Sequence, residues 1–141
     1  MSKSASDQLG FTVWIDPRPG TTFAEQGALA RRLEDYGRAR DLFFGGAPLC
    51  AAVFAEDRSL SASDQADLID WLIDDPIVRS VAVSPLSSAA GRPANRAEGY
   101  LKVQATDLTL IGVTLLYRTR ALSAELYLQL LGGFVRPLTL H

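Results

Sequence analysis

Hydrophobic and polar positions alternate in the first part of the chain. Within residues 9–15, the apolar side chains of Phe11, Val13 and Ile15 recur at every second position, which is the pattern of a strand with one buried face. The proline-rich segment 16–20 ends this pattern. The first predicted element is therefore a strand at 9–15.

A helical period follows in residues 23–40. Leu29 and Leu33 are spaced for one buried face, and Thr22 with Glu25 has the form of a capping box. This spacing predicts a helix over 23–40.

A second helical period is more regular. Residues 65–74 follow several N-cap candidates at 61–64, and Pro76 stops the pattern. At about 100° per residue, the apolar side chains fall in one arc, which predicts the core face. These side chains are Leu68, Ile69, Leu72 and Ile73.

Three extended segments complete the pattern. Phe43-Phe44 and the run 49–55 predict a β-hairpin around a Gly45-Gly46 turn. The β-branched run 77–83 predicts a further strand, closed by Pro85. The resulting order, β-α-β-β-α-β, is that of a ferredoxin-like unit with an antiparallel sheet and both helices on one face. The predicted fold class is thus α+β.

The rest of the chain is predicted to belong to the same single domain, 1–141. Its predicted parts are the βαββαβ unit at 9–86, a loop at 87–97 and a C-terminal extension at 98–141. The extension is predicted to be β-rich, with a hairpin around Thr106-Asp107, and to pack on the sheet or extend it. For residues 122–131, a short helix and a strand both remain open.

Composition and charge narrow the class of protein. The 141 residues are 48% hydrophobic and 21% charged, with a net charge of −2, which is ordinary for a globular protein. Neither an apolar leader nor a run of about 18 apolar residues is present, so we expect a cytoplasmic protein. Residues 1–76 contain seven Lys and Arg against thirteen Asp and Glu, whereas residues 77–141 contain seven against three. Such an asymmetry either steers a charged partner or reflects two differently solvated faces.

Residues that commonly carry catalysis are scarce. The single histidine is His141, which argues against Ser-His-Asp, Cys-His and histidine-ligated metal sites. The single cysteine, Cys50, lies in an apolar run and is interpreted as a buried structural thiol. Gly45-Gly46 matches neither glycine pattern of nucleotide-binding loops. We therefore expect no enzyme activity, no cofactor and no metal.

The second predicted helix carries the clearest candidate site. Asp67, Asp70 and Asp74 gather opposite its apolar face, and Trp71 lies among them. One aromatic anchor within an acidic surface is suited to a basic protein partner. The alternative is that Trp71 folds under a tail segment and the aspartates only solvate the helix.

Basic side chains are concentrated in the second half of the chain. Arg92, Arg96, Arg118 and Arg120 have few acidic neighbours in sequence, so they are the candidates for contact with RNA.

Short motifs along residues 9–86 carry a resemblance to a known family. They are Leu9–Val13, Pro19–Thr21 with Glu25-Gln26, Gly45-Gly46, and Asp64–Ala66 with Trp71-Leu72, Val81 and Ser84–Leu86. Together they resemble the YggL-type family of small bacterial proteins that associate with the large ribosomal subunit. The resemblance implies a βαββαβ fold and a ribosomal partner. It covers 9–86 only, because residues 1–8 lack the family's basic amino end and residues 87–141 extend beyond it.

Three hypotheses of function follow. The leading one is a noncatalytic binding protein of YggL-like type, in which Trp71 and its neighbouring aspartates contact a basic ribosomal protein. The alternative is an immunity protein or antitoxin-like inhibitor that binds a basic protein partner. The third is a small ligand-sensing domain or enzyme that uses the sheet face, with Tyr100, Tyr117 or Arg118 lining a pocket. The oligomeric state is left open.

Overall fold

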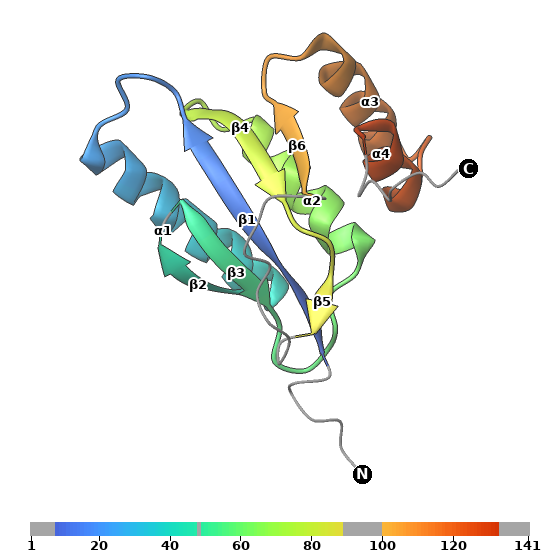
Figure 1. Ribbon diagram of the computed structural model, residues 1–141, viewed down its shortest axis with the longest axis horizontal. Coiled ribbons are helices and arrows are strands. Elements are labelled where there is room, and N and C mark those ends of the chain that lie inside the picture. Colours follow the sequence, from blue (N-terminus) through green and yellow to red (C-terminus); the bar gives the residue numbers. More distant parts are fainter. Residues whose placement is uncertain (1–7, 48, 89–99, 133–141) are drawn as a thin grey trace.

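A computed structural model describes residues 8–47, 49–88 and 100–132, which form an α+β structure with a six-stranded antiparallel sheet and four helices (Figure 1). The strands are β1 (Leu9–Pro17), β2 (Phe43–Ala47), β3 (Cys50–Phe54), β4 (Val78–Val83), β5 (Ser87–Ser88) and β6 (Leu101–Gln104). The helices are α1 (Phe23–Arg40), α2 (Ala62–Ile73), α3 (Leu108–Arg118) and α4 (Ala124–Leu130). Five strands follow the order β2-β3-β1-β4-β6, and β5 pairs with β1. Both α1 and α2 lie behind the sheet in Figure 1, and α3 and α4 lie beyond β6.

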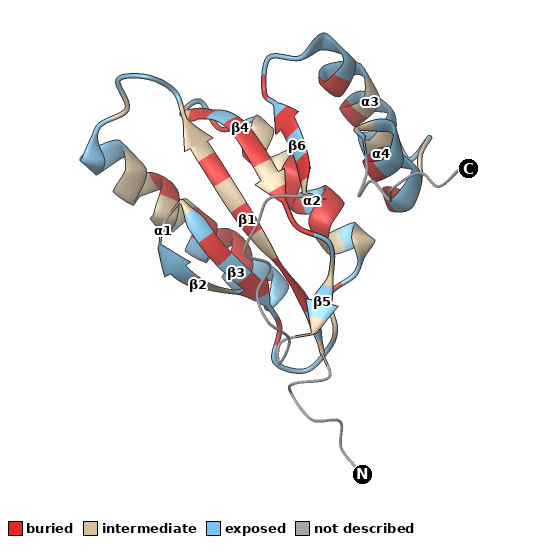
Figure 2. Cartoon of the chain, in the orientation of Figure 1, coloured by how far each residue is buried: buried red, intermediate tan, exposed pale blue. Residues whose placement is uncertain are grey.

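Strand β1 occupies the centre of the sheet, between β3 and β4. Phe11, Val13 and Ile15 are at most 5% exposed and belong to one core with side chains of α1 and α2. Thr12 and Trp14 alternate with them and are only partly buried on the other face. The predicted alternation is therefore confirmed. It divides the sheet into a face covered by α1 and α2 and an opposite face on which none of the described helices packs, called the open face below (Figure 2).

Helix α1 occupies the predicted range, and the predicted capping box is present. Thr22 Oγ1 accepts a hydrogen bond from Glu25 N at 3.1 Å, and Glu25 Oε1 accepts one from Thr22 N at 2.8 Å. Near the other end, a Cβ added to Gly37 would lie 2.6 Å from Leu42 O and 2.8 Å from the Phe44 ring. Glycine is required there because β2 passes close to the helix.

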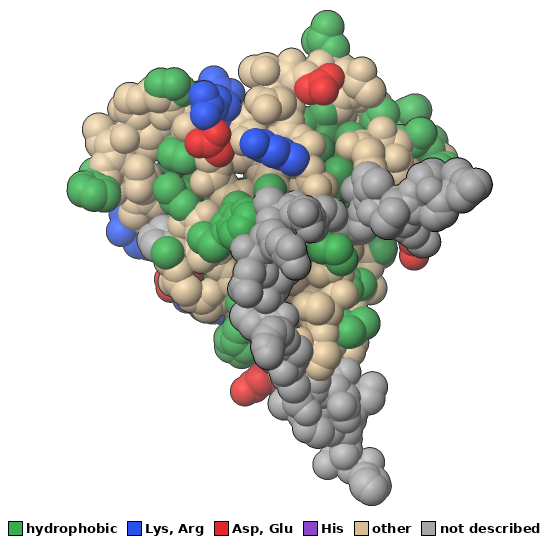
Figure 3. Space-filling view, in the orientation of Figure 1, with side chains coloured by type: hydrophobic (Ala, Val, Ile, Leu, Met, Phe, Trp, Pro, Cys, Tyr) green, Lys and Arg blue, Asp and Glu red, His purple; other side chains and the backbone are tan. Residues whose placement is uncertain are grey.

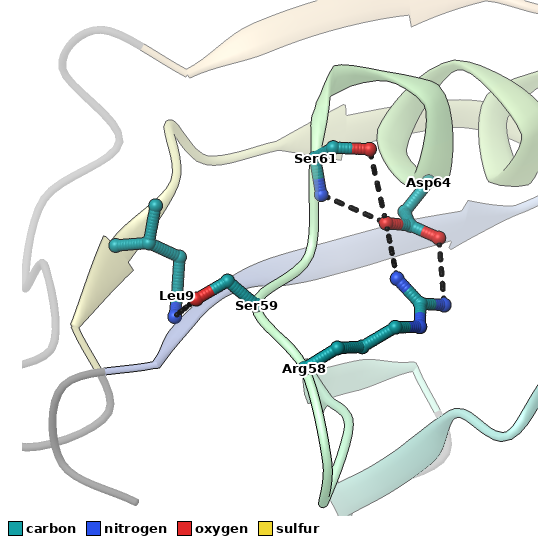
Figure 4. Close-up of polar contacts among 5 residues, drawn as sticks. All are labelled: Leu9, Arg58, Ser59, Ser61 and Asp64. Atoms are coloured by element: carbon teal, nitrogen blue, oxygen red, sulfur yellow. Dashed lines mark hydrogen bonds and ion pairs between the residues drawn. The ribbon is translucent and has the colours of Figure 1, made fainter. Parts of the chain in front are cut away.

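The start of α2 is held by charged and polar contacts (Figure 4). The Asp64 carboxylate accepts hydrogen bonds from Arg58 at 3.0 and 3.1 Å and from Ser61 N at 2.7 Å. Burial alone would raise the pKa of Asp64, but these hydrogen bonds outweigh burial and lower that pKa below its ordinary value. Ser59 Oγ accepts from Leu9 N at 2.9 Å, which ties the segment before α2 to β1.

The predicted core face of α2 is confirmed. Leu68, Ile69 and Leu72 are 0% exposed, whereas Ile73 is only partly buried. Gln65 is 1% exposed and donates a hydrogen bond to Ser84 O at 2.9 Å, so the polar group within this core has a partner.

The hairpin between α1 and α2 differs from its prediction. Gly45 and Gly46 are not the turn but part of β2, and the chain reverses after Ala47. Gly46 has a φ of 119°, and a Cβ added there would lie 2.9 Å from Cys50 O. Glycine is required at position 46 because of the backbone conformation within the strand. The Gly-Gly dipeptide was interpreted as a turn, and that interpretation overlooks this requirement.

The prediction that Cys50 is buried is also wrong. Its side chain is exposed, because the buried positions of β3 are Ala51 and Val53. An apolar run of small residues does not reveal which alternate positions face the core.

The C-terminal extension is only partly as predicted. Residues 101–104 form β6, which pairs with β4 and extends the sheet. The hairpin predicted around Thr106-Asp107 is wrong, because 108–118 form helix α3. Within residues 100–132, the described part of the extension, helix predominates over strand. Of the loop predicted at 87–97, Ser87 and Ser88 form β5, and the remainder lies outside the described residues.

Local and tertiary contacts explain why α3 is a helix. The Asp107 carboxylate accepts a hydrogen bond from Thr109 N at 2.8 Å and caps the first turn. Leu110 and Thr114, four residues apart, are each 2% exposed, so a helix buries both on one side. Packing therefore overrides the β propensity of the sequence.

The alternatives left open for residues 122–131 are resolved as helix α4. Ser123 Oγ accepts a hydrogen bond from Leu126 N at 3.1 Å at its start. Tyr127 and Leu128 are buried, and the former is 0% exposed. In the part of the chain that the structure describes, no helix is long and apolar enough to cross a membrane.

Candidate functional site

The acidic face predicted for α2 lies against the C-terminal helices. Asp67 and Asp74 are exposed and Asp70 is half-buried. All three point towards α3, which contributes the side chains that bind them. The predicted gathering of these carboxylates on one side of α2 is therefore present.

Arg118 bridges two carboxylates of this acidic face. Its Nε donates to Asp70 Oδ1 at 2.7 Å, and its Nη2 lies 2.6 Å from Asp70 Oδ1 and 2.5 Å from Asp74 Oδ2. The hydrogen bond from Arg118 to Asp70 is the main reason that the pKa of Arg118 is raised. The sequence predicted that Asp70 and Asp74 bind a basic protein and that Arg118 contacts RNA. In the structure these side chains are bonded to each other.

Asp67 also has a partner on α3. The Tyr117 hydroxyl donates a hydrogen bond to Asp67 Oδ1 at 2.6 Å. Burial first, and then this bond to a carboxylate, raise the pKa of Tyr117 far above its ordinary range. The Tyr117 ring stacks on Tyr127 of α4 with centroids 4.5 Å apart. Tyr127 in turn shares a hydrogen bond of 2.8 Å with Thr114.

The predicted aromatic anchor is engaged within the chain. Trp71 is partly buried, and its ring centroid lies 4.9 Å from that of Tyr36 on α1. The Arg40 guanidinium lies over the Tyr36 ring, 4.0 Å from its centroid. Trp71 therefore contributes to the contact between α1 and α2.

A cleft of about 500 Å³ lies between α2 and the C-terminal helices. Its lining includes Asp67, Asp70, Arg118 and Arg120. Asp70 and Arg118 form an ion pair there, whereas Asp67 accepts a hydrogen bond from the uncharged Tyr117 hydroxyl. Arg120 lines the cleft from a left-handed backbone position with a φ of 66°. The other basic residues predicted to contact RNA, Arg92 and Arg96, lie outside the described residues.

The open face of the sheet presents a second candidate surface. The third hypothesis named this face with Tyr100 but not with Trp14, and the Tyr117 and Arg118 it also named lie against α2 instead. Trp14 on β1 contacts Tyr100, which precedes β6, in a tilted arrangement with ring centroids 4.9 Å apart. The Trp14 indole N–H donates to Cys50 Sγ on β3. The sequence contained a signal for the position of Trp14. The alternation of β1 places its side chain on the face opposite the core.

A second aromatic pair stands at the edge of the same face. Phe43 on β2 and Phe54 on β3 are register partners whose rings stack with centroids 5.6 Å apart. They are 44% and 41% exposed. Register places Gly45 opposite Ala52, so small residues separate the two aromatic pairs. Figure 3 shows hydrophobic side chains over this face.

Charged side chains flank the aromatic pairs on the side of β4 and β6. Lys102 pairs in register with Ala82 and is exposed. Arg79 Nη2 lies 2.5 Å from Asp16 Oδ2 in an exposed ion pair. Basic side chains are visible beside the hydrophobic ones in Figure 3. The open face thus combines two pairs of aromatic rings with one exposed lysine and the Arg79–Asp16 ion pair at its margin.

Although Cys50 is exposed, partial burial of its thiol raises the pKa of that group, which opposes thiolate formation. Within the described ranges, no cluster of His, Cys, Asp and Glu side chains is arranged to hold a metal ion.

No protein-family model, no curated protein and no solved structure matches this chain.

Proposed function

We propose that this chain is a noncatalytic binding protein whose open sheet face takes a macromolecular partner. The observation that carries the proposal is the Trp14–Tyr100 pair, which lies on the sheet face opposite the helices and is only partly buried. Aromatic side chains are costly to leave at a surface and are concentrated where proteins bind partners.

The partner we propose is unpaired RNA of the large ribosomal subunit. Bases of single-stranded RNA stack on aromatic side chains, and phosphates are bound by lysine and arginine. The open face offers both, with Trp14 and Phe54 as stacking groups and Lys102 at the margin. The resemblance to the YggL type points to the same partner and to the bacterial cytoplasm.

A ferredoxin-like arrangement of residues 9–83 is part of this proposal. The antiparallel order β2-β3-β1-β4, with α1 and α2 on one side, supports it. Such an arrangement leaves the other side of the sheet free for a partner.

The acidic face of α2 is the less favoured surface for a partner. Asp70 and Asp74 already pair with Arg118, and Asp67 accepts from Tyr117. A basic partner would have to displace these contacts, whereas the aromatic rings of the open face need no such rearrangement.

The test is sedimentation of cell lysate through sucrose gradients at low and moderate salt, with detection of this chain in the large-subunit fraction. We expect comigration that weakens as salt rises. Trp14→Ala and Phe54→Ala should each weaken association by about 5- to 100-fold, the range expected for loss of one stacked base. Lys102→Glu should also weaken the association, and its effect should be larger at low salt than at moderate salt.

Matched variants separate this surface from the rest of the molecule. Phe23→Ala removes an aromatic ring that is 89% exposed on α1, and Arg31→Glu reverses an exposed charge on the same helix. Both should leave comigration unchanged. Thermal melting of every variant shows whether it is folded.

Two results would contradict the proposal. Comigration that survives Trp14→Ala and Phe54→Ala would remove the open face from the interface. Absence from ribosomal fractions, with copurification of one stoichiometric small protein, would favour the inhibitor hypothesis instead.

A further inference from the structure

The cleft between α2 and the C-terminal helices is of a size that takes a small molecule. Its volume of about 500 Å³ falls within the range of roughly 300–1,000 Å³ that is usual for such sites. Half-buried Leu122 and buried Ala124 give the cleft an apolar wall. The charged side chains that line it are two carboxylates and two guanidinium groups, those of Asp67, Asp70, Arg118 and Arg120. A ligand complementary to this lining carries both charges and an apolar part.

Arg120 occupies a backbone position at which glycine is the usual residue. It follows Thr119, the C-cap of α3, and has a φ of 66°. Ala121 N donates to Leu116 O at 2.9 Å and Arg120 N donates to Tyr117 O at 3.0 Å, which are the two hydrogen bonds of a Schellman motif. A residue with a Cβ is strained in this left-handed conformation. The helix end by itself favours glycine, so the arginine side chain requires a different explanation.

The Arg120 guanidinium has no partner among the described residues. Its side chain is exposed, lines the cleft, and makes no hydrogen bond, ion pair or ring contact with another described side chain. Arg118 differs, because Asp70 and Asp74 bind it. A guanidinium with free N–H donors is suited to a carboxylate, which it can bind through two parallel hydrogen bonds.

Each carboxylate of the cleft keeps one oxygen that no described residue uses. Asp67 Oδ1 accepts a hydrogen bond from the Tyr117 hydroxyl, and Asp70 Oδ1 accepts one from Arg118. The Oδ2 atoms of both aspartates accept no hydrogen bond from the described part of the chain. Because an ionised carboxylate accepts several hydrogen bonds, an ammonium group fits here without displacing the contacts between α2 and α3.

We propose that this cleft binds a small zwitterion, namely a free amino acid or short peptide with an aliphatic side chain. The ligand carboxylate binds Arg120, its ammonium group lies against Asp67 and Asp70, and its side chain contacts Leu122. A simple anion would meet the two aspartates and a simple cation would meet the two arginines, whereas a zwitterion avoids both repulsions. The inference does not depend on the proposed function, because none of the residues that line the cleft lies on the open sheet face.

NMR titration of the full chain with leucine and with the dipeptide leucyl-leucine is the first test. We expect at least one of these probes to shift the Arg120 side-chain and Asp67 amide resonances until they saturate. N-acetyl-leucine lacks the ammonium group and leucinamide lacks the carboxylate. Each should bind about 10-fold or more weakly than leucine, because one charged contact is lost.

Arg120→Gly separates binding from folding. Glycine relieves the strain of the left-handed conformation, so the melting temperature should rise by about 3 °C. The affinity for the probe should fall by about 10- to 100-fold, because the carboxylate loses its partner. Asp41→Gly is the matched control, since Asp41 is the other described non-glycine residue with a positive φ, 58°, at the end of α1. It should raise the melting temperature similarly and leave the affinity unchanged.

Asp67→Asn tests the ammonium end of the ligand. The amide oxygen still accepts from Tyr117, so the contact between α2 and α3 is kept while the charge is removed. The affinity for leucine should fall about 10-fold, whereas binding of N-acetyl-leucine should not weaken further. Asp35→Asn, which removes an exposed carboxylate on α1 far from the cleft lining, should change neither affinity.

Several outcomes would overturn the inference. The absence of saturable shifts with either probe up to about 10 mM would do so, as would undiminished binding by the Arg120→Gly chain. Equal affinity for leucine and for inorganic phosphate would assign the cleft to simple anions. Nuclear Overhauser contacts between Leu122 and residues 133–141 in the free chain would show that the cleft is filled by the chain itself.

Discussion

Helices α2 and α3 are similar in length but differ in how their sequences specify burial. Helix α2 has 12 residues with aspartates on one side and apolar side chains on the other. Helix α3 has 11 residues and no charge before Arg118. In α2 the pattern itself identifies the buried face, whereas in α3 every side is apolar and only its neighbours decide which side is covered. The pattern of a helix is informative only where its two sides differ.

The largest expected effect comes from removing equivalent side chains from the two helices. Ile69 is 0% exposed, so Ile69→Ala should lower the free energy of unfolding by about 3 kcal/mol, because it leaves a cavity in the core. Ile111 is 43% exposed, so Ile111→Ala should cost less than about 1 kcal/mol. Urea unfolding of dilute protein measures both. Equal losses would contradict the distinction between the helices.

A smaller effect is expected where the two helices are joined. Arg118→Gln removes the ion pairs to Asp70 and Asp74 and should cost about 1 kcal/mol at low salt. The value is modest because Arg118 and Asp74 side chains are 39% and 65% exposed. Unfolding at low and high salt should show the difference shrinking with salt.

Arg38→Gln is the control for that experiment. Its partner is Asp35, and both side chains are 73% exposed, so the loss should be no more than about 0.3 kcal/mol. A loss at Arg118 no larger than at Arg38 would show that α3 is not held to α2 by charge.

The smallest effect concerns the start of α2 and depends on pH. The pKa of Asp64 is lowered in the folded state, so its stabilising contribution is present above the unfolded pKa of about 3.9 and is lost as pH falls through the folded pKa. Arg58→Met removes two hydrogen bonds to the Asp64 carboxylate. The pKa of Asp64 should then rise, because fewer hydrogen bonds offset the effect of burial. The expected loss of stability is about 0.5–1 kcal/mol at neutral pH and vanishes in acid.

Measurement of unfolding over a pH series, with NMR titration of the Asp64 carboxyl, checks this prediction. Lys102→Met, which removes an exposed cation from the open sheet face, is a control that should leave the Asp64 titration unchanged. A stability difference for Arg58→Met that persists at low pH would mean that Arg58 acts through something other than the ionised carboxylate.

Most of the elements within residues 9–83 were predictable. In β1, α1 and α2 the local pattern, the capping residues and the tertiary core agree, so a short window of sequence contains enough information. The predictions that were wrong in this range concerned glycines and small residues. Gly46 is needed for a backbone angle within a strand, and Cys50 lies among alanines that give no alternation.

The candidate sites were predictable only in part. The gathering of Asp67, Asp70 and Asp74 follows from helix geometry, and it is present. Their contacts with Tyr117 and Arg118 join residues about 45 to 50 positions apart in sequence, and no local signal encodes such a pairing. The contact of Trp14 with Tyr100 is of the same long-range kind.

By itself, the sequence determined the capped helices α1 and α2, the alternating central strand and the scarcity of catalytic side chains. Only the tertiary structure decided that the acidic side of α2 is bonded to Tyr117 and Arg118, that α3 is a helix whose outer side no described segment covers, and that aromatic rings gather on the open sheet face. The physical reason is that capping and amphipathic period act between residues a few positions apart. Ion pairing, ring stacking and exposure depend on which distant segments the fold brings together.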